Sequence, residues 1–249
     1  MKTLSYSELS TFLTCEQKWV IQYVEGERTP PNHYMFFGSL IHGLLEDSYR
    51  RGKQLTNAQI KSVYMKLYNK EYVDIRDIDY PAELEHATQL YRAYSLYYDD
   101  WTVETVAIEQ YRKDEELGLS GVADLLFRSG TGEIWLREHK TRSQFVSNPA
   151  DIQVHIYKRL WPEVEAIEYN QLKSYEYKGG LANVDGTKLF QRVPILSSVG
   201  DQERLSDLLE EARLRMYAIR KGKPPMGTYV HHICARCDWK GVCPWTLGI

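Results

Sequence analysis

The chain has 249 residues, of which 43% are hydrophobic and 26% charged, and its 19 tyrosines and 6 tryptophans exclude an intrinsically disordered polypeptide. The formal net charge of −3 argues against a protein that coats nucleic acid through a uniformly basic surface. The sequence lacks both a signal-peptide pattern at its start and a run of about 18 apolar residues, so we expect a cytoplasmic protein without membrane association.

The first hundred residues are predicted to be mainly helical. Ser5 followed by Glu8 forms a capping-box pattern, and apolar residues then recur at helical spacing as far as Tyr23. We therefore expect one amphipathic helix that contains Cys15. Further helices are expected at about residues 38–51, which include His42, and at about 57–73 and 81–100.

The predicted secondary structure changes from helices to strands after residue 101. Residues 103–111, 117–127 and 133–141 predict three consecutive strands with short turns, which indicates an antiparallel meander. A helix is expected to begin with Asn148 as its N-cap and Pro149 at its first position, and to run to about Leu160. Strands at 166–177 and 188–196, a charged helix at 202–220 and a cysteine-containing tail complete the prediction.

This order of elements predicts an α/β protein. We find no internal repeat, low-complexity tract or flexible linker, which favours a single domain over residues 1–249. Residues 1–100 would form a helical N-terminal portion, 101–200 the sheet core, and 201–249 a C-terminal helix followed by the cysteine segment.

A constellation of carboxylates and a lysine lies in the predicted meander. Glu138 and Lys140 are two residues apart on one strand and share a face, while His139 points away and leaves its backbone carbonyl near that face. Asp124, on the preceding strand, can lie opposite this pair. Two carboxylates and a carbonyl suit Mg²⁺ or Mn²⁺, and the lysine can position an attacking water. The alternative is a strand that displays solvated charges.

These residues resemble the acidic and lysine core of PD-(D/E)XK nucleases, and more narrowly the RecB-like exonuclease branch, which includes CRISPR-associated RecB-like exonucleases and phage nucleases. The resemblance rests on Gly121-x-x-Asp124, Glu138-x-Lys140, Gly38-x-x-x-His42-x-x-Leu45 and Gln153-x-x-x-Tyr157, in that family's order. It implies a restriction-endonuclease-like core, in which a central mixed sheet is flanked by helices. It also implies Asp124, Glu138, Lys140, Gln153 and Tyr157 as catalytic residues, with His42, Asp124, Glu138 and the carbonyl of His139 as metal ligands.

Elementary chemistry bears on several of these roles. Gln153 and Tyr157 lie four residues apart on one helix face, where they can contact the lysine or a DNA phosphate. Imidazole is a sensible ligand where Mn²⁺ competes with Mg²⁺, although His42 can also be a hydrogen-bonded helix histidine. Glu109, on the strand before Asp124, is either an accessory acidic residue or a surface glutamate.

All four cysteines fit one arrangement, with Cys15 near the start and Cys234-x₂-Cys237-x₅-Cys243 near the end. Four thiolates suit Zn²⁺ or an iron-sulfur cluster, and their spacing alone does not choose between them. The resemblance implies a structural 4Fe-4S cluster, with zinc or unrelated buried thiols as alternatives. A metal centre that joins Cys15 to the C-terminal cysteines closes a loop of more than two hundred residues. By chain-entropy reasoning, this closure contributes on the order of 5 kcal/mol to stability.

The expected function is a metal-dependent DNA nuclease that hydrolyses phosphodiester bonds. The resemblance implies an exonuclease that acts on single-stranded DNA or DNA ends. It also implies partner proteins from recombination and repair, from phage DNA processing or from CRISPR adaptation. One alternative is a non-catalytic DNA-binding or complex-assembly subunit that keeps the nuclease fold and the cluster. Another is a zinc-stabilised protein whose acidic residues are incidental.

Overall fold

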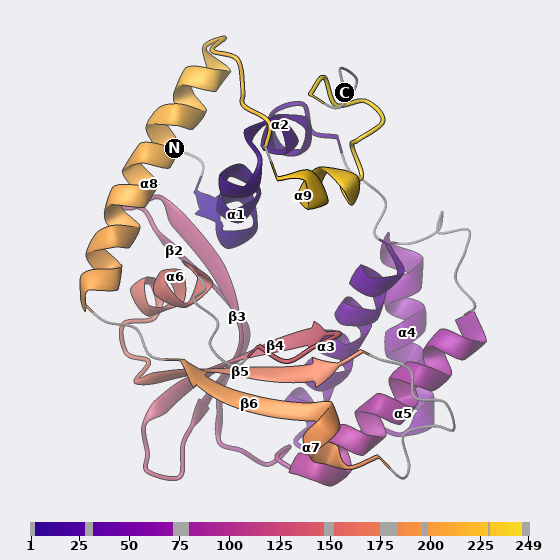
Figure 1. The fold of residues 1–249 in the computed structure, drawn as a ribbon. Helices are drawn as coiled ribbons and strands as arrows, with labels where there is room; N and C mark the ends of the chain where they lie inside the picture. Colours follow the sequence, from indigo (N-terminus) through magenta and orange to yellow (C-terminus); the bar gives the residue numbers. More distant parts are fainter. Residues whose placement is uncertain are drawn as a thin grey trace.

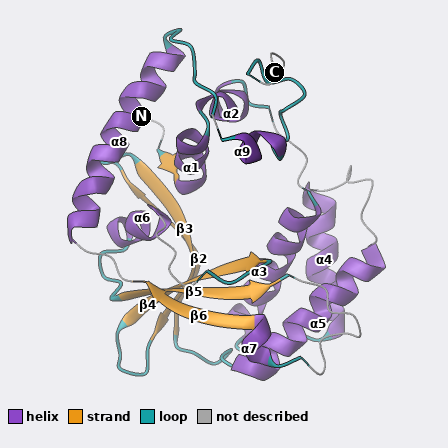
Figure 2. Cartoon of the chain, viewed as in Figure 1, coloured by secondary structure: helices purple, strands orange, loops and turns teal. Residues whose placement is uncertain are grey.

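The computed structural model describes residues 3–27, 32–71, 80–146, 152–174, 184–195, 199–228 and 230–245. Within these ranges, a six-stranded mixed sheet is flanked by helices (Figures 1 and 2). The strands are β1 (Leu4–Ser5), β2 (Thr105–Asp114), β3 (Leu119–Arg128), β4 (Ile134–Arg142), β5 (Ala166–Lys173) and β6 (Phe190–Ile195). The predicted fold class, a restriction-endonuclease-like α/β core with N-terminal helices, is confirmed.

The sheet has the order β1-β3-β4-β5-β6, and β2 pairs with β3 off this path. The expected meander is present, because β2 and β4 both pair antiparallel with β3. The pairing of β4 with β5 is parallel, and β6 returns antiparallel to β5. The parallel pair needs a crossover connection, and that connection contains α6 (Ile152–Leu160).

Hydrophobic residues form two clusters against this sheet. The first joins α3 (His33–Arg51), α4 (Asn57–Glu71) and α5 (Tyr80–Tyr98) to strand residues that include Leu125 and Leu172. The second joins α1 (Tyr6–Thr14), α6 and α8 (Val199–Arg220) to strand residues that include Leu126 and Ile167. Leu125 and Leu126 are neighbours in a strand and therefore point to opposite faces, so each face is covered by its own helices.

The first predicted helix is not continuous, and this prediction was wrong at Cys15. The chain is extended at this residue, with φ −163° and ψ 112°, and then continues as α2 (Glu16–Trp19) and a π-helix, η1 (Val20–Val24). The backbone N–H of Gln17 donates to the carbonyl of Met226 at 3.1 Å. A contact with a residue some two hundred positions away thus replaces the local helical hydrogen bond. Ser5 caps α1 as expected, accepting from the N–H of Glu8.

Most other predicted elements differ from the structure only at their ends. Helix α3 begins earlier than expected, at His33, because the side chain of Asn32 accepts from the N–H of Met35 and caps the helix. The expected N-cap at Asn148 and Pro149 lies outside the described residues, as do the predicted ends of the strands at 177 and 196 and of the helix at 73.

Short elements were not predicted. These are β1, α7 (Gly186–Leu189) and α9 (His231–Ala235). Helix α7 includes the first two residues of the strand predicted at 188–196, since Asp185 caps it by accepting from the N–H of Thr187. In the part of the chain that the structure describes, no helix combines the length and the apolar character needed to cross a membrane.

Candidate active site

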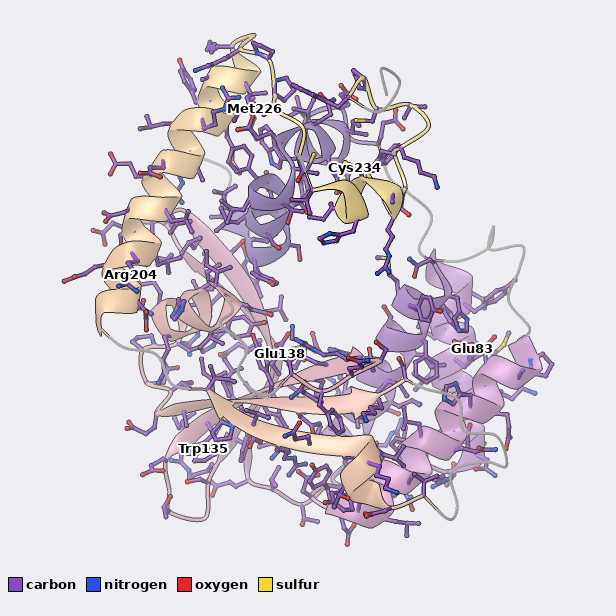
Figure 3. The ribbon with its side chains drawn as sticks, in the orientation of Figure 1. Glu83, Trp135, Glu138, Arg204, Met226 and Cys234 are labelled. Atoms are coloured by element: carbon purple, nitrogen blue, oxygen red, sulfur yellow. The ribbon has the colours of Figure 1, made fainter. Side chains whose placement is uncertain are left out.

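The predicted site residues come from four elements. Asp124 lies on β3, Glu138 and Lys140 lie on β4, His42 lies on α3, and Gln153 and Tyr157 lie on α6. Figure 3 labels Glu138, near the point where β3 meets β4 in that view. The meander aligns the two carboxylates as expected, and the packing of α3 on the sheet adds the imidazole from the distant N-terminal portion.

Three side chains hold the carboxylate of Glu138, which is only 5% exposed. Its Oε1 accepts from the Nζ of Lys140 and from the Nε2 of Gln153, both at 2.9 Å, and its Oε2 accepts from the hydroxyl of Tyr157 at 2.9 Å. The Nζ of Lys140 also donates to the Oε1 of Gln153 at 2.6 Å. The helix pair Gln153 and Tyr157 therefore contacts both the lysine and the glutamate.

Asp124 lies against the backbone of β4 and the ring of His42. Its Oδ2 accepts from the N–H of His139 at 2.8 Å and lies 3.5 Å from the Nδ1 of His42. Burial, reinforced by the neighbouring Glu138 carboxyl, raises the pKa of Asp124 well above its ordinary value. Two carboxyl groups this close repel each other when both are charged, which is the electrostatic condition that a cation relieves.

His42, Glu109 and Asp124 form a compact group of possible metal ligands. One ligand atom from each lies within 4.8 Å of the others. Glu109 is therefore not an exposed surface glutamate, which was one of the two roles that the sequence allowed. Burial, together with the charges of Asp124 and Glu46, raises its pKa to about 7. Glu138 stays outside this compact group, although it was expected among the ligands.

The backbone of β2 is unusual at Glu109. Its φ of +49° lies in the left-handed region, which costs a residue other than glycine about 1–3 kcal/mol. Surrounding structure must impose such a conformation, and it occurs at the residue whose carboxylate lies with His42 and Asp124.

The backbone carbonyl and the side-chain ring of His139 lie in different environments, as the alternation of side chains along a strand predicted. Its backbone carbonyl lies beside His42, while its ring is buried. There the Nδ1 lies 2.8 Å from the Nδ2 of Asn170, and the ring stacks on Tyr49. Burial holds the pKa of His139 well below its ordinary value, so the imidazole is neutral, and its ring also packs edge-on against the His42 ring, with centroids 5.8 Å apart.

Two motif glycines permit close packing around these residues. A Cβ at Gly38 would lie 2.9 Å from the Oγ1 of Thr141, so glycine lets α3 approach β4 one turn before His42. A Cβ at Gly121 would lie 2.9 Å from the Cδ1 of Leu160, so glycine lets α6 approach β3. Each glycine thus sets the distance between the sheet and a helix that contributes to the site.

The four cysteines line one cavity of about 300 Å³, to which α9 and its flanking turns contribute (Figure 3, Cys234). Cys15 reaches it from the break between α1 and α2. The sulfurs are not tightly grouped, since no three of them lie within 4.8 Å of one another in the described ranges. The buried Nε1 of Trp239, which also lines the cavity, has no hydrogen-bond partner among the described residues.

Sequence reasoning missed several residues around the acidic group. Arg50, Arg51 and Lys66 line the cavity that opens beside it. Helical periodicity could have indicated Arg50, because it lies eight residues after His42 on the same face of α3.

Comparison with known proteins identifies the class to which this geometry belongs. The sequence profile of the PD-(D/E)XK nuclease superfamily matches residues 3–244. The chain therefore belongs to the PD-(D/E)XK nuclease superfamily. No curated protein sequence matches it.

A solved structure agrees with this fold. A protein from Eubacterium rectale, named as a “putative exonuclease”, superimposes with a TM-score of 0.56 and 10% sequence identity, over 95% of this chain and 86% of that one. At this identity the similarity establishes the fold. The structure of SSO0001 aligns over 90% of this chain and 91% of its own, with 14% identity and a TM-score of 0.38, which is too low to support an argument.

Proposed function

We propose that this protein is a metal-dependent deoxyribonuclease, an exonuclease of the RecB-like branch that acts on single-stranded DNA or DNA ends. The observation that carries the proposal is the convergence of Asp124, Glu138 and Lys140 with His42 and Glu109, in a chain that belongs to a nuclease superfamily. The motif resemblance and the name of the similar Eubacterium rectale protein support exonuclease action.

The donor set fits a hard divalent cation. His42, Glu109 and Asp124 offer an imidazole and two carboxylates within ligand distance of one another, and the carbonyl of His139 lies beside His42. Glu138 belongs to the proposed ligand set because its carboxylate keeps lone pairs beyond the three hydrogen bonds that orient it. Bound Mg²⁺ or Mn²⁺ would neutralise the scissile phosphate and lower the pKa of a water molecule.

Lys140 is the proposed catalytic lysine. Its ammonium group is held by Glu138 and Gln153 and lies 5.3 Å from the centre of the Tyr169 ring, so its position is restricted before substrate binds. A positioned cation can orient the attacking water and stabilise the negative charge that develops on the phosphate. Gln153 and Tyr157 are positioning residues, since they act on the phosphate through Glu138 and Lys140.

The proposal is tested by cleavage of end-labelled single- and double-stranded DNA in the presence of Mg²⁺ or Mn²⁺. Asp124→Ala and Lys140→Ala are expected to lower kcat by about 10²- to 10⁴-fold while the protein stays folded. Lys113→Ala is a matched control, because this lysine lies on the neighbouring strand β2 with an exposed side chain. It should retain wild-type activity.

Retained cleavage in both active-site variants would contradict this assignment. A wild-type protein that binds DNA but never cleaves it would instead favour a non-catalytic DNA-binding or assembly subunit. The products of cleavage from each labelled end would show whether the enzyme requires an end and in which direction it proceeds.

A 4Fe-4S cluster on the four cysteines forms the second part of the proposal. A single tetrahedral Zn²⁺ would hold the sulfurs about 3.8 Å apart, given Zn–S bonds of about 2.3 Å. No three of the thiols lie that close together in the described ranges, but all four line one cavity of about 300 Å³, where the indole N–H of Trp239, which has no partner among the described residues, can donate to a sulfur. Visible absorption of anaerobically purified protein tests this, since an iron-sulfur cluster absorbs broadly and zinc does not.

A further inference from the structure

A cavity of about 710 Å³ opens beside the acidic group and extends between α3 and α4. His42, Glu109 and Asp124 line it near the sheet, and Arg50 and Lys66 line it along the two helices. Its volume lies within the range of about 300–1,000 Å³ that is typical of ligand sites. Much of this cavity therefore lies beyond the residues proposed to hold the metal.

Helix α3 supplies one wall in a regular pattern. His42, Glu46 and Arg50 follow one another at intervals of four residues and all line the cavity, so they form one row on the helix surface. Eight residues of helix correspond to about 12 Å along the axis. The chemistry of the row changes over this distance from metal-binding groups near the sheet to a cation two turns away.

The arginines of this wall are held in place by carboxylates of the same helix. Arg50 places its Nε and Nη2 at 3.0 and 2.9 Å from the Oε1 of Glu46, and Arg51 donates its Nε to the Oδ2 of Asp47 at 2.9 Å. A guanidinium group has five N–H donors, so each arginine keeps donors for a second acidic partner. Such a group loses little conformational freedom when it binds a phosphate.

Lys66 supplies a cation from the opposite wall. It lies on α4 with an exposed side chain, and it has no ion-pair partner among the residues that the structure describes. A cation of this kind contributes its full charge to an incoming anion, because no protein carboxylate has to be displaced.

We propose that this cavity binds the nucleic-acid strand next to the scissile phosphate, with Lys66, Arg50 and Arg51 contacting backbone phosphates a few nucleotides from the metal-binding group. This inference rests on the proposed nuclease function and adds a strand-binding subsite to it. A stacked strand rises about 3.4 Å per nucleotide, so the 12 Å between His42 and Arg50 corresponds to three or four nucleotides.

The dimensions of the cavity select a single strand over a duplex. The cavity has a volume of about 710 Å³, which gives room for part of a single strand. A B-DNA duplex, whose major groove alone is about 12 Å wide, is too bulky for it. DNA would therefore have to be unpaired on the side of the scissile bond that faces these helices.

The experiment compares two lysines of α4. Lys66→Ala removes the cavity cation, and Lys61→Ala removes a cation from the same helix that is exposed but does not line the cavity. Binding of a fluorescent single-stranded oligonucleotide is measured against salt concentration with Mg²⁺, in the Lys140→Ala background so that the strand stays intact. KM and kcat for cleavage are measured separately with Lys140 present.

We expect Lys66→Ala to weaken strand binding and raise KM by about ten-fold, with kcat nearly unchanged, and to reduce the slope of log K against log salt by about 1. Lys61→Ala should stay within about two-fold of the wild type. The effect should shrink for a mononucleotide, which reaches the metal-binding group but not Lys66. A blunt-ended duplex, which has no unpaired nucleotides, should show no difference between the two variants.

Equal behaviour of the two variants on single strands, in a protein that cleaves DNA, would overturn this inference and leave the proposed function standing. The converse is also distinguishable, because binding is measured apart from cleavage. Strand binding that depends on Lys66 in a protein that cleaves no DNA would overturn the nuclease proposal and support the subsite.

Discussion

Glu109 shows how a single side chain can change the chemistry expected of the site. Its carboxylate lies with His42 and Asp124, while Glu138 is turned toward Lys140, Gln153 and Tyr157. The left-handed backbone at Glu109 accompanies this arrangement at a cost in stability. The site therefore contains three carboxylates of different accessibility, and protons compete with a metal ion for each of them.

The raised pKa of Glu109 predicts a pH-dependent response to metal. Because a ligand must be deprotonated, Mn²⁺ affinity should rise by about ten-fold between about pH 6 and pH 8, on either side of the pKa of about 7. The measurement is the increase in Tm on adding Mn²⁺ at each pH. Glu109→Gln should lower the affinity and remove the step near pH 7.

Without metal, the same group acts on stability in the opposite direction. Its folded-state pKa of about 7 exceeds the ordinary value of 4.5, so its stabilising contribution is present below about pH 4.5 and is lost as the pH rises toward 7. Glu115→Gln is the control, since this glutamate lies just beyond the same strand and is 75% exposed. A metal response with no step near pH 7 in the wild type would contradict the assignment.

At the scale of elements, the site depends on how closely α3 approaches β4. Gly38 faces the hydroxyl of Thr141, and His42 follows one turn later on the same helix. Alanine is a better helix former than glycine by up to about 1 kcal/mol, but its methyl group would lie 2.9 Å from the Oγ1 of Thr141. Overpacking of this kind costs about 1–3 kcal/mol, so the clash should outweigh the gain.

Gly38→Ala is therefore expected to lower the free energy of unfolding by about 1 kcal/mol and to weaken metal binding, because the shifted helix carries His42. Chemical denaturation and metal titration measure the two effects. The double variant Gly38→Ala with Thr141→Ala removes the clashing hydroxyl and should recover both. Gly130→Ala is the control, since its Cβ would meet no atom within 4 Å.

Failure of the double variant to recover metal binding would show that the helix is not displaced by this contact. This double-mutant comparison separates the effect of packing from a direct loss of metal ligands, because neither Gly38 nor Thr141 belongs to the proposed ligand set. If Gly38→Ala were as stable and as active as Gly130→Ala, the close approach would have no role in the site.

At the scale of the whole molecule, contacts between the two ends of the sequence hold the N-terminal helices in place. The carboxylate of Glu16 accepts from the Nε and Nη2 of Arg215 at 2.7 and 2.6 Å and from the N–H of Met226 at 2.7 Å. Burial would raise the pKa of Glu16, but these hydrogen bonds outweigh it and lower the pKa. The Cys15 thiol meets the C-terminal thiols in the adjacent cavity.

A cluster on these cysteines would add a covalent link to the same junction. Cys237→Ala is expected to lower the free energy of unfolding by up to about 5 kcal/mol, which corresponds to a fall in Tm of about 10 °C or more. Thermal unfolding of anaerobically purified protein measures this. Val242→Ala, an exposed change in the same segment, should leave the Tm unchanged. Full stability of Cys237→Ala would contradict the structural role of the cluster.

Much of the fold was predictable from local patterns. Alternating residues identified the β2-β3-β4 meander, and the same alternation placed Glu138 and Lys140 on one face with the ring of His139 on the other. Helical spacing placed Gln153 and Tyr157 together. These features depend on neighbours within a few residues, so backbone geometry alone determines them.

The remaining features depend on contacts between distant segments, which periodicity does not report. Only the tertiary structure ends the first helix at Cys15, because Met226 accepts the hydrogen bond that a continuous helix would have kept. Only the packing of α3 on the sheet brings Glu109 to His42 and forms the cavity with Arg50 and Lys66. The sequence by itself determined the motif residues and the strands that carry them, whereas long-range packing decided which carboxylates meet and what lies beside them.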